Sequence, residues 1–315
     1  MQRFAVLVPI LATVVACGDV PVDPGTDAAT DPKPDGHDVD PDAAPPARCD
    51  LAKPFGAPTL VAGVNGASDD RFARLSADEL TIYFASTRPG GPGGLDLYQA
   101  TRDTRDGSFG TPSLMPISTA ADDWGATATA DGLGLYFSRR NAAGTGDILL
   151  ATRGNLQTEF GGEAVLAQVN TTAEDNEPYL TADDRVLYFT SSRDAGYHLY
   201  RAERTGAGGF GNVQRLAEVD SPSSDAWAVP SADDLHLIWG SDRADGGNAG
   251  RADIWEASRS PGETRFGNIA RNAELSSAGT DEPDWLSADG CVIYFASDRA
   301  GTTGGLDIWK AQRGR

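Results

Sequence analysis

Apolar and polar positions alternate along most of this chain in short blocks that are typical of β-strands. The clearest block spans residues 281–313. In it, a first strand at 282–286 leads through a turn containing Asp-Gly into a second strand at 291–297, and a glycine-rich loop leads to a third strand at 307–312. The second strand is dense in β-branched and aromatic residues, so the pattern predicts a β-meander rather than helices.

The same block occurs five times, and a fixed internal period indicates a repeat architecture. Each copy has an acid in its first turn, at Asp78, Asp131, Asp183, Asp233 and Asp289. Each copy also has a Phe-Gly pair, at Phe55, Phe109, Phe160, Phe210 and Phe266. The period of about 50 residues exceeds the ~40–45 residues of a common propeller blade, so we expect long loops.

The order of the strands predicts a closed ring. A fourth strand is expected after Phe-Gly, as at 165–169 and 213–219, yet the repeat region opens with such a segment at 58–64 and ends with the third strand at 307–312. This offset is explained if the opening segment supplies the fourth strand of the last blade and so closes the ring. We therefore predict an all-β fold, a single β-propeller of five four-stranded blades closed by the N-terminal strand.

Two cysteines lie at this predicted joint. Cys49 comes just before the incoming strand, and Cys291 begins the second strand of the last blade. An even pair of cysteines in an exported protein favours a disulfide. We predict that Cys49 and Cys291 are bonded.

The N-terminus has the pattern of an export signal. Residues 1–16 carry one arginine and an apolar run too short to span a membrane, and small residues lead directly into Cys17. This pattern resembles a bacterial lipobox, which predicts a lipoprotein signal peptide and a lipidated Cys17; an ordinary signal peptide with an incidental cysteine is the alternative. Gly18 stands where an inner-membrane retention Asp would be, so we expect an outer-membrane lipoprotein, facing the periplasm or the surface.

The next segment, residues 17–48, reads as a disordered tether. It is rich in Asp and Pro and nearly lacks large apolar side chains, so it cannot bury enough surface to offset its chain entropy. Its acids could bind calcium, but their spacing does not fit an EF-hand, and a solvated spacer is favoured. The chain carries −20 in all and residues 49–315 carry −15, which argues against nucleic acid and anionic headgroups as direct partners.

The last copy also carries a family resemblance. Its D-x-x-P-x-x-S-A-D-G-x-x-I-Y-F-x-S-x-R stretch, followed by G-G-x-D-I-W, resembles the WD40-like β-propeller repeat of the TolB type. The resemblance covers 69–313 and implies the propeller rather than a function. TolB proteins have an additional N-terminal domain where this sequence has the tether, so their partners cannot be carried over to this protein.

Each copy pairs an acid with an arginine across its first hairpin. Folding the hairpin about its turn places the two side chains opposite each other, where each pair stabilises the sheet by roughly 0.2–1 kcal/mol. The predicted structural pairs are Asp70–Arg88, Asp123–Arg140, Asp175–Arg193, Asp225–Arg243 and Asp281–Arg299. The alternative is a ring of acids that binds a cation or a sugar, but catalysis needs unlike environments for its carboxyl groups, which five similar copies do not offer.

Better candidates for ligand binding are Trp124, Glu177, Trp227 and Glu282, which break the repeat, together with the first-strand acid Asp284. All five lie at or near the starts of first strands, which face the central channel. Tryptophans there either stack on a sugar or peptide or fill the channel core. Acids there would serve a carbohydrate-active enzyme.

No other chemistry is indicated. His198 replaces an acid that the other copies carry in the third strand, and local hydrogen bonding is the expected role because no His/Cys cluster with metal spacing exists. There is no nucleophile elbow or phosphate loop, so we predict no catalytic residue, metal or cofactor. The leading function is a non-catalytic protein- or ligand-binding module, and the alternative is a glycosidase-like propeller.

Overall fold

The computed structural model describes residues 48–206, 208–244 and 251–315. The predicted signal peptide, the lipidation site Cys17 and the tether up to residue 47 lie outside these residues. Within the described ranges, no helix is long and apolar enough to cross a membrane.

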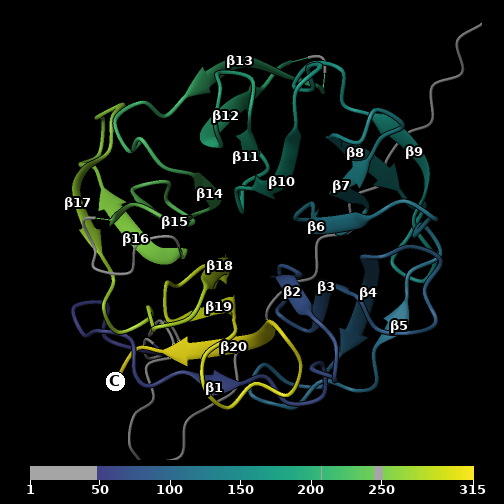
Figure 1. The fold of residues 1–315 in the computed structure, drawn as a ribbon, viewed down its shortest axis with the longest axis horizontal. Helices are drawn as coiled ribbons and strands as arrows, with labels where there is room; N and C mark the ends of the chain where they lie inside the picture. The colour runs from purple at the N-terminus through teal and green to yellow at the C-terminus, as the bar shows by residue number, and fades with distance from the viewer. Residues whose placement is uncertain (1–47, 207, 245–250) are drawn as a thin grey trace, which may run out of the picture. The chain divides into compact units, whose positions relative to one another are not determined.

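In the described residues, twenty strands form five four-stranded antiparallel sheets around a central axis (Figure 1). The first strands of the blades are β2 (Asp70–Leu75), β6 (Asp123–Ala128), β10 (Asp175–Leu180), β14 (Asp225–Pro230) and β18 (Asp281–Leu286). The second strands are β3 (Thr81–Ser86), β7 (Gly134–Arg140), β11 (Val186–Ser191), β15 (His236–Ser241) and β19 (Val292–Ser297). The third strands are β4 (Asp96–Thr101), β8 (Gly146–Thr152), β12 (His198–Arg204), β16 (Asp253–Ser258) and β20 (Asp307–Gln312). The outer strands are β5 (Ser113–Leu114), β9 (Gly161–Val165), β13 (Phe210–Arg215), β17 (Gly267–Arg271) and β1 (Thr59–Leu60).

The N-terminal strand closes the ring, which confirms the five-bladed propeller predicted from the sequence. β1 pairs antiparallel with β20, with Thr59 opposite Lys310 and Leu60 opposite Trp309. The outer strands end earlier than predicted: β9 stops at Val165 and β13 stops at Arg215. A tight turn follows β9, because the Val169 amide donates to the Leu166 carbonyl, and it directs the chain to the next blade.

A disulfide fixes the joint between the two ends of the ring. Cys49 and Cys291 are bonded, with their Cα atoms 5.6 Å apart and a separation of 242 positions in sequence. A crosslink that closes so long a loop restricts the unfolded chain by on the order of 5 kcal/mol in the chain-entropy model. Arg48 adds ion pairs across the same joint, to Glu79 and to Asp289.

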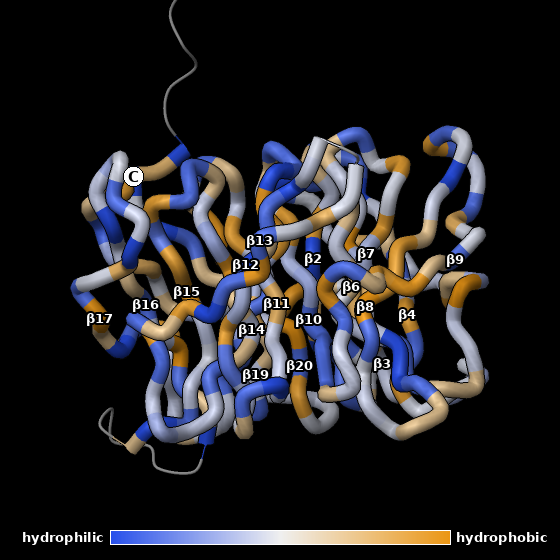
Figure 2. The backbone as a smooth tube through the Cα atoms, turned by 90° about the horizontal axis from the view of Figure 1, so that it is seen from above, coloured by the Kyte–Doolittle hydropathy of each residue, from blue (hydrophilic) through white to orange (hydrophobic). Residues whose placement is uncertain are grey.

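The core lies between the blades rather than in one central cluster. The second strands are buried on both faces, as at Tyr83, Phe84 and Phe295, because each sheet packs against a neighbour on either side. Figure 2 shows the ring edge-on, with apolar stretches along the strands and polar loops at both faces. The loops at one face contain the turns between first and second strands, and we call it the turn face.

An arginine at the end of each third strand packs on the phenylalanine of a Phe-Gly pair. The guanidinium carbon lies 4.0–4.8 Å from the ring centroid, at cation–π distance. The pairs are Arg102–Phe109, Arg153–Phe160, Arg204–Phe210, Arg259–Phe266 and Arg313–Phe55. In the last pair the two partners come from opposite ends of the repeat region, so this contact also joins the ring.

A fully buried aspartate begins each first strand and is held by an arginine. In blade 1, Arg88 donates to Asp70 at 2.5 Å and to the carbonyl of Val64, which belongs to the connection from the preceding blade. The other Asp70 oxygen accepts from the Gly66 amide of that connection. The equivalent pairs are Asp175–Arg193 at 2.5 Å, Asp225–Arg243 at 2.6 Å and Asp281–Arg299 at 2.6 Å.

Blade 2 departs from the predicted pairing of Asp123 with Arg140. Its buried Asp123 accepts from Arg139 at 2.6 Å, while Arg140 pairs with the neighbouring Asp122 at 3.0 Å. The register explains the correction. Arg139 stands directly opposite Asp123, at the position that a serine such as Ser86 occupies in the other blades, so it reaches the carboxylate without extending round the strand end.

This exchange predicts unequal effects of two neighbouring substitutions on the free energy of unfolding. Arg139→Ala leaves the buried Asp123 carboxylate without its cation, and we expect a loss of about 3–5 kcal/mol. Arg140 is 42 % exposed, so Arg140→Ala should cost about 0–1 kcal/mol. Urea unfolding of both variants measures the difference, and equal losses would contradict the assignment.

Candidate functional site

The five first strands contact one another around the channel, so the residues after each buried aspartate line it. The first such positions are Arg71, Trp124, Asn176, Ala226 and Glu282, and the second are Phe72, Gly125, Glu177, Trp227 and Pro283. These residue types have nothing in common. The repeated residues therefore form a common scaffold, and the residue types at these two positions differ from blade to blade.

A β-bulge at the second position turns the chain in four of the blades. Phe72, Glu177 and Trp227 have φ values of 58°, 56° and 57°, in the left-handed region that non-glycine residues rarely adopt. Such bulges re-aim side chains and are common beside functional sites. In blade 5 the second position is Pro283, whose ring fixes a negative φ, and the irregularity falls at Asp284 instead.

The bulge at Glu177 is held by hydroxyl groups from the adjacent second strands. The Glu177 amide donates to Ser138 of blade 2 at 2.8 Å, and Thr190 of blade 3 donates to the Glu177 carboxylate at 2.8 Å. The Trp227 amide in turn donates to the Thr190 hydroxyl at 3.3 Å. These bonds link three blades and fix the direction of Glu177.

A pocket of about 400 Å³ opens at the channel end opposite the turn face. We call it the mouth pocket. Its wall contains three of the predicted residues, Trp124, Glu177 and Trp227, together with Arg71 and Tyr197. The structure thus brings these three together on the face formed by the loops between blades.

The other two predicted acids do not line the pocket. Glu282 is 4 % exposed, and its carboxylate is 3.4 Å from Arg71 Nε. Asp284 is completely buried. Arg74, Tyr179 and Trp285, which lie further along the first strands, are buried as well. We also call the mouth pocket the cup.

The two tryptophans occupy different positions in the repeat. Trp124 directly follows its buried aspartate, whereas Trp227 lies in the bulge. Glycines make room for both rings: a Cβ on Gly146 would come within 3.0 Å of the Trp124 ring, and one on Gly240 within 2.4 Å of the Trp227 ring. Trp124 is only 4 % exposed and mainly fills space, whereas Trp227 is half-buried and offers its ring to the pocket.

Three acids and two arginines share the channel. Burial raises the pKa of Glu177 to about 7, and the neighbouring Glu282 adds to the rise. Burial likewise raises the pKa of Glu282, against the effect of Arg71. Burial raises the pKa of Asp284 to about 8, although Arg74 opposes it. With two cations for three carboxyl groups, one carboxyl group retains its proton near neutral pH.

Several buried polar atoms at the cup lack a hydrogen-bond partner in the described residues. They include one donor, Trp227 Nε1, and one acceptor, Asn176 Oδ1. Arg71 Nε and Glu282 Oε2 also make no hydrogen bond there, but they lie 3.4 Å apart as an ion pair. A buried polar group without a partner costs about 1–3 kcal/mol. A ligand that supplies hydrogen-bond partners to these atoms would offset this cost.

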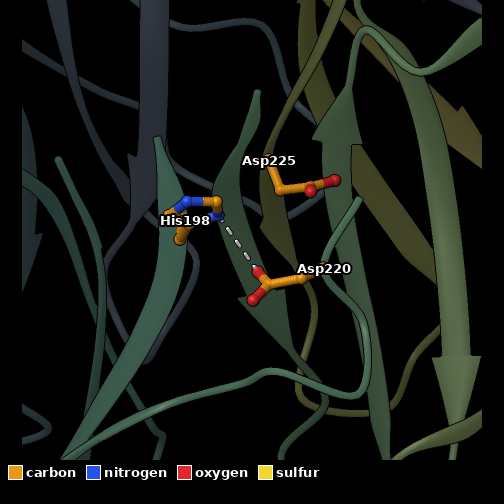
Figure 3. Close-up of side chains that lie close together, drawn as sticks. All are labelled: His198, Asp220 and Asp225. Carbon is orange, nitrogen blue, oxygen red and sulfur yellow. Dashed lines mark ion pairs between the residues drawn. The ribbon is translucent and has the colours of Figure 1, made fainter. Parts of the chain in front are cut away.

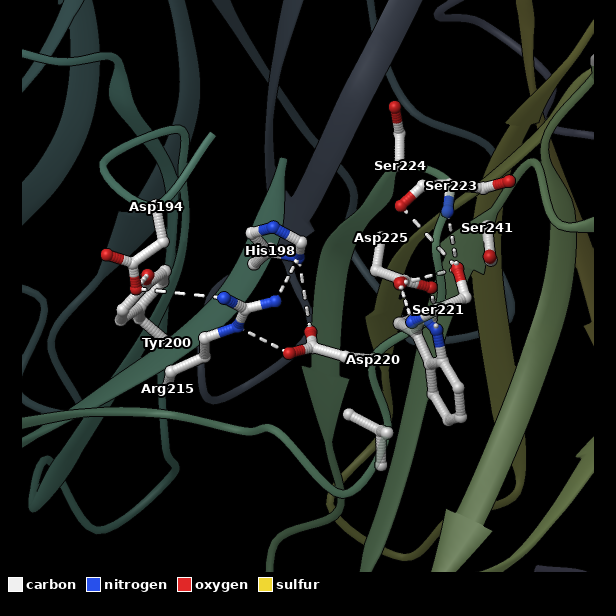
Figure 4. A network of polar contacts seen from close by, with 12 residues as sticks. Asp194, His198, Tyr200, Arg215, Asp220, Ser221, Ser223, Ser224, Asp225 and Ser241 are labelled. Carbon is white, nitrogen blue, oxygen red and sulfur yellow. Dashed lines mark hydrogen bonds and ion pairs between the residues drawn. The ribbon is translucent and has the colours of Figure 1, made fainter. Parts of the chain in front are cut away.

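His198 belongs to a separate cluster between blades 3 and 4. One ligand-type atom each of His198, Asp220 and Asp225 lies within 4.8 Å of the others, a grouping that could hold a metal ion (Figure 3). Arg215 takes that place: it donates to Asp220 at 2.5 Å and its Nη2 is 3.1 Å from His198 Nδ1 (Figure 4). Asp225 is already bound by Arg243. The cluster is an ion-pair network in which Asp220 Oδ1 lies 3.4 Å from His198 Nδ1 and makes no hydrogen bond within the described residues.

Comparison with known proteins identifies the fold. No family model matches the chain, and comparison with curated proteins gives no significant match. Among solved structures, a thermostable family-43 glycoside hydrolase has a TM-score of 0.51 at 10 % identity, over 81 % of this chain and 91 % of that one. TolB from Acinetobacter baumannii has a TM-score of 0.48 at 16 % identity, over 82 % of this chain and 54 % of that one.

A putative TolB from Agrobacterium tumefaciens has a TM-score of 0.43 at 17 % identity, over 78 % of this chain and 90 % of that one. This chain spans about half the length of the Acinetobacter TolB. At these identities the likeness shows the propeller fold alone. It favours neither a binding protein nor a hydrolase.

The raised pKa of Glu177 predicts a pH dependence of stability. An unfolded glutamate has a pKa near 4.5, so the folded protein holds the extra proton between pH 4.5 and about 7, and its stability falls as the pH rises through that window. Glu177→Gln removes this loss. We expect the variant to match the wild type at pH 5 and to be more stable at pH 8 by on the order of 2–3 kcal/mol.

Urea unfolding at both pH values measures this difference. Glu163→Gln, which changes an exposed acid on β9, is the control and should behave like the wild type at both. A Glu177→Gln effect of equal size at pH 5 and pH 8 would show that Glu177 is ionised in the fold throughout.

Proposed function

We propose that this protein is a non-catalytic binding module that holds a saccharide unit in the mouth pocket. The observation that carries the proposal is the set of unpartnered donors and acceptors at the cup, together with the ring of Trp227. A sugar hydroxyl both donates and accepts a hydrogen bond, so it can satisfy both kinds of atom. An apolar sugar face packs on an indole ring.

The size and charge of the pocket support a neutral ligand. A volume of about 400 Å³ falls within the range of small-molecule sites, ~300–1,000 Å³. Its other arginines are already paired, Arg140 with Asp122 and Arg251 with Asp298. The cup thus offers hydrogen bonds without a strong excess of either charge.

One observation favours hydrolysis as the second candidate function. Glycosidases use two carboxyl groups, one protonated and one ionised. Glu177 has a pKa of about 7, and Glu282 lies beside Arg71, so the two groups have unlike environments. Both side chains are largely buried, which supports binding ahead of hydrolysis.

Binding to a panel of neutral oligosaccharides, followed by calorimetry of those that bind, tests the proposal. We expect saturable binding that Trp227→Ala weakens at least tenfold, because the stacking surface is lost. Gly240→Ala should weaken it as well, since the new methyl group displaces the ring. Leu156→Ala, at an exposed residue of another pocket, is the control and should bind as the wild type does.

If no oligosaccharide binds, the proposal is wrong. The same incubations are analysed for released sugars. Hydrolysis that both Glu177→Gln and Glu282→Gln abolish would replace binding with catalysis as the function.

We also propose that the module acts outside the cytoplasm on a lipid anchor. A disulfide at the ring joint is typical of exported proteins, and the sequence before Cys17 resembles a lipobox. Wild-type cells should incorporate labelled palmitate into the protein, and Cys17→Ser should abolish the label. Incorporation into Cys17→Ser, or free thiols at Cys49 and Cys291 in cell-derived protein, would contradict this location.

A further inference from the structure

The ring joint contains a second pocket that differs in charge from the rest of the protein. It has a volume of about 260 Å³ and lies on the turn face, between the closing blade and blade 1. We call it the joint pocket. Its charged wall residues are Arg48, Arg102, Arg105 and Lys310 against Glu79 and Asp106. Four cations and two acids stand out in a chain with a net charge of −20.

The acids of the joint pocket engage only part of this positive charge. Glu79 is bound by Arg48 at 2.8 Å and lies 4.0 Å from Arg105. Arg102 is 6 % exposed and donates to the Glu79 carbonyl and to the Tyr294 hydroxyl, but to no carboxylate in the described residues. Its charge is therefore buried and not neutralised by a direct ion pair.

Lys310 is the second cation without a carboxylate partner. It stands on β20 opposite Tyr294 on one side and Thr59 of the N-terminal strand on the other. The residue is half-buried, and its amine makes no hydrogen bond or ion pair within the described residues. Burial lowers the pKa of Lys310, Arg102 lowers it further, and Asp106 opposes them.

The unpaired cation is specific to the closing blade. The same position in the other third strands holds Gln99, Leu150, Arg201 and Glu256. Arg201 has acidic neighbours, with Glu203 at 3.4 Å and Asp234 at 3.9 Å. The repeat therefore does not require an unpaired lysine at this third-strand position.

We propose that the joint pocket binds a tetrahedral oxyanion, a phosphate or sulfate group, with Lys310 and Arg102 as its main cationic contacts. Charge-assisted hydrogen bonds from ammonium and guanidinium groups to such oxygens are about twice as strong as neutral ones. The anion would stabilise the charged form of Lys310 and neutralise Arg102. Exposed Arg105 stands at the rim, where it can complete the set.

Calorimetric titration of the intact protein with inorganic phosphate and with sulfate tests the site. We expect saturable binding, which Lys310→Met weakens at least tenfold, since Met keeps the length of the side chain and removes its charge. Lys53→Met is the matched control: Lys53 is exposed, bonds the Arg315 carbonyl and lies outside the pocket wall, so phosphate binding should not change.

A second variant guards against misfolding of Lys310→Met. Arg105→Gln removes an exposed charge at the rim and should weaken binding severalfold while the circular dichroism spectrum stays unchanged. Two results would overturn the proposal: phosphate binding that is equal in wild type and Lys310→Met, or heat released equally by chloride at the same ionic strength.

A phosphate group can come from a small molecule or from a lipid headgroup. Vesicles of phosphatidylcholine with phosphatidic acid distinguish the two sources. Binding of vesicles that inorganic phosphate competes away assigns a headgroup, and binding of phosphate without vesicles assigns a soluble ligand. Absence of both would again reject the site.

Discussion

The propeller depends on a buried carboxylate at the start of every first strand. Asp70 is completely buried, and its two oxygens accept from Arg88 and from the Gly66 amide. The same arginine donates to the carbonyl of Val64, in the connection from the preceding blade. A buried charge is stable only when it is paired and hydrogen-bonded, so the carboxylate fixes the loop, the arginine and the strand together. Five such clamps set the position of each blade relative to the one before it.

This clamp explains why the positions just after it can vary. With the strand start fixed, the next residues do not need to hold the blades together, and they range from Arg71 to Pro283. Some of these residues have a strained backbone: a non-glycine residue at positive φ, such as Glu177, carries a conformational strain energy of roughly 1–3 kcal/mol. Strain of this kind persists where the surroundings determine the backbone, as the hydroxyl groups of Ser138 and Thr190 do here.

The sequence was sufficient for the architecture because that rests on repetition. The offset between the opening and closing strands predicted the joint, and the positions of Cys49 and Cys291 followed from it. Repetition was misleading in blade 2, where Arg139 and Arg140 are adjacent and only the strand register decides which one meets Asp123. An arginine also follows an alanine by two positions at the end of every third strand, as at Ala100 and Arg102. The sequence alone does not assign its contact with the Phe-Gly pair, because a residue at a strand end has no predicted partner.

The residues of the mouth pocket can be predicted from the sequence, but their arrangement in space cannot. Trp124, Glu177 and Trp227 were found because they break the repeat, but their meeting in one cup depends on bulges that leave no signature when the residue is not glycine. The joint pocket could not be found in this way. Lys310 looks like an ordinary third-strand residue, and its surroundings come from Arg48 and Thr59 at the far end of the repeat region.

A ring built from copies therefore has two sources of new chemistry, the variable positions around the axis and the joint. At the axis, the first strands of the five blades lie next to one another. The variable residue of one blade therefore lies near those of the other blades, and together they form a mixed set of donors and acceptors. At the joint, one blade is completed by a strand from the opposite end of the repeat region, so its environment has no counterpart in the repeat. That asymmetry accounts for a lysine without a direct carboxylate partner in an acidic protein, because the strand that Lys310 faces on its outer side, β1, comes from the other end of the repeat region.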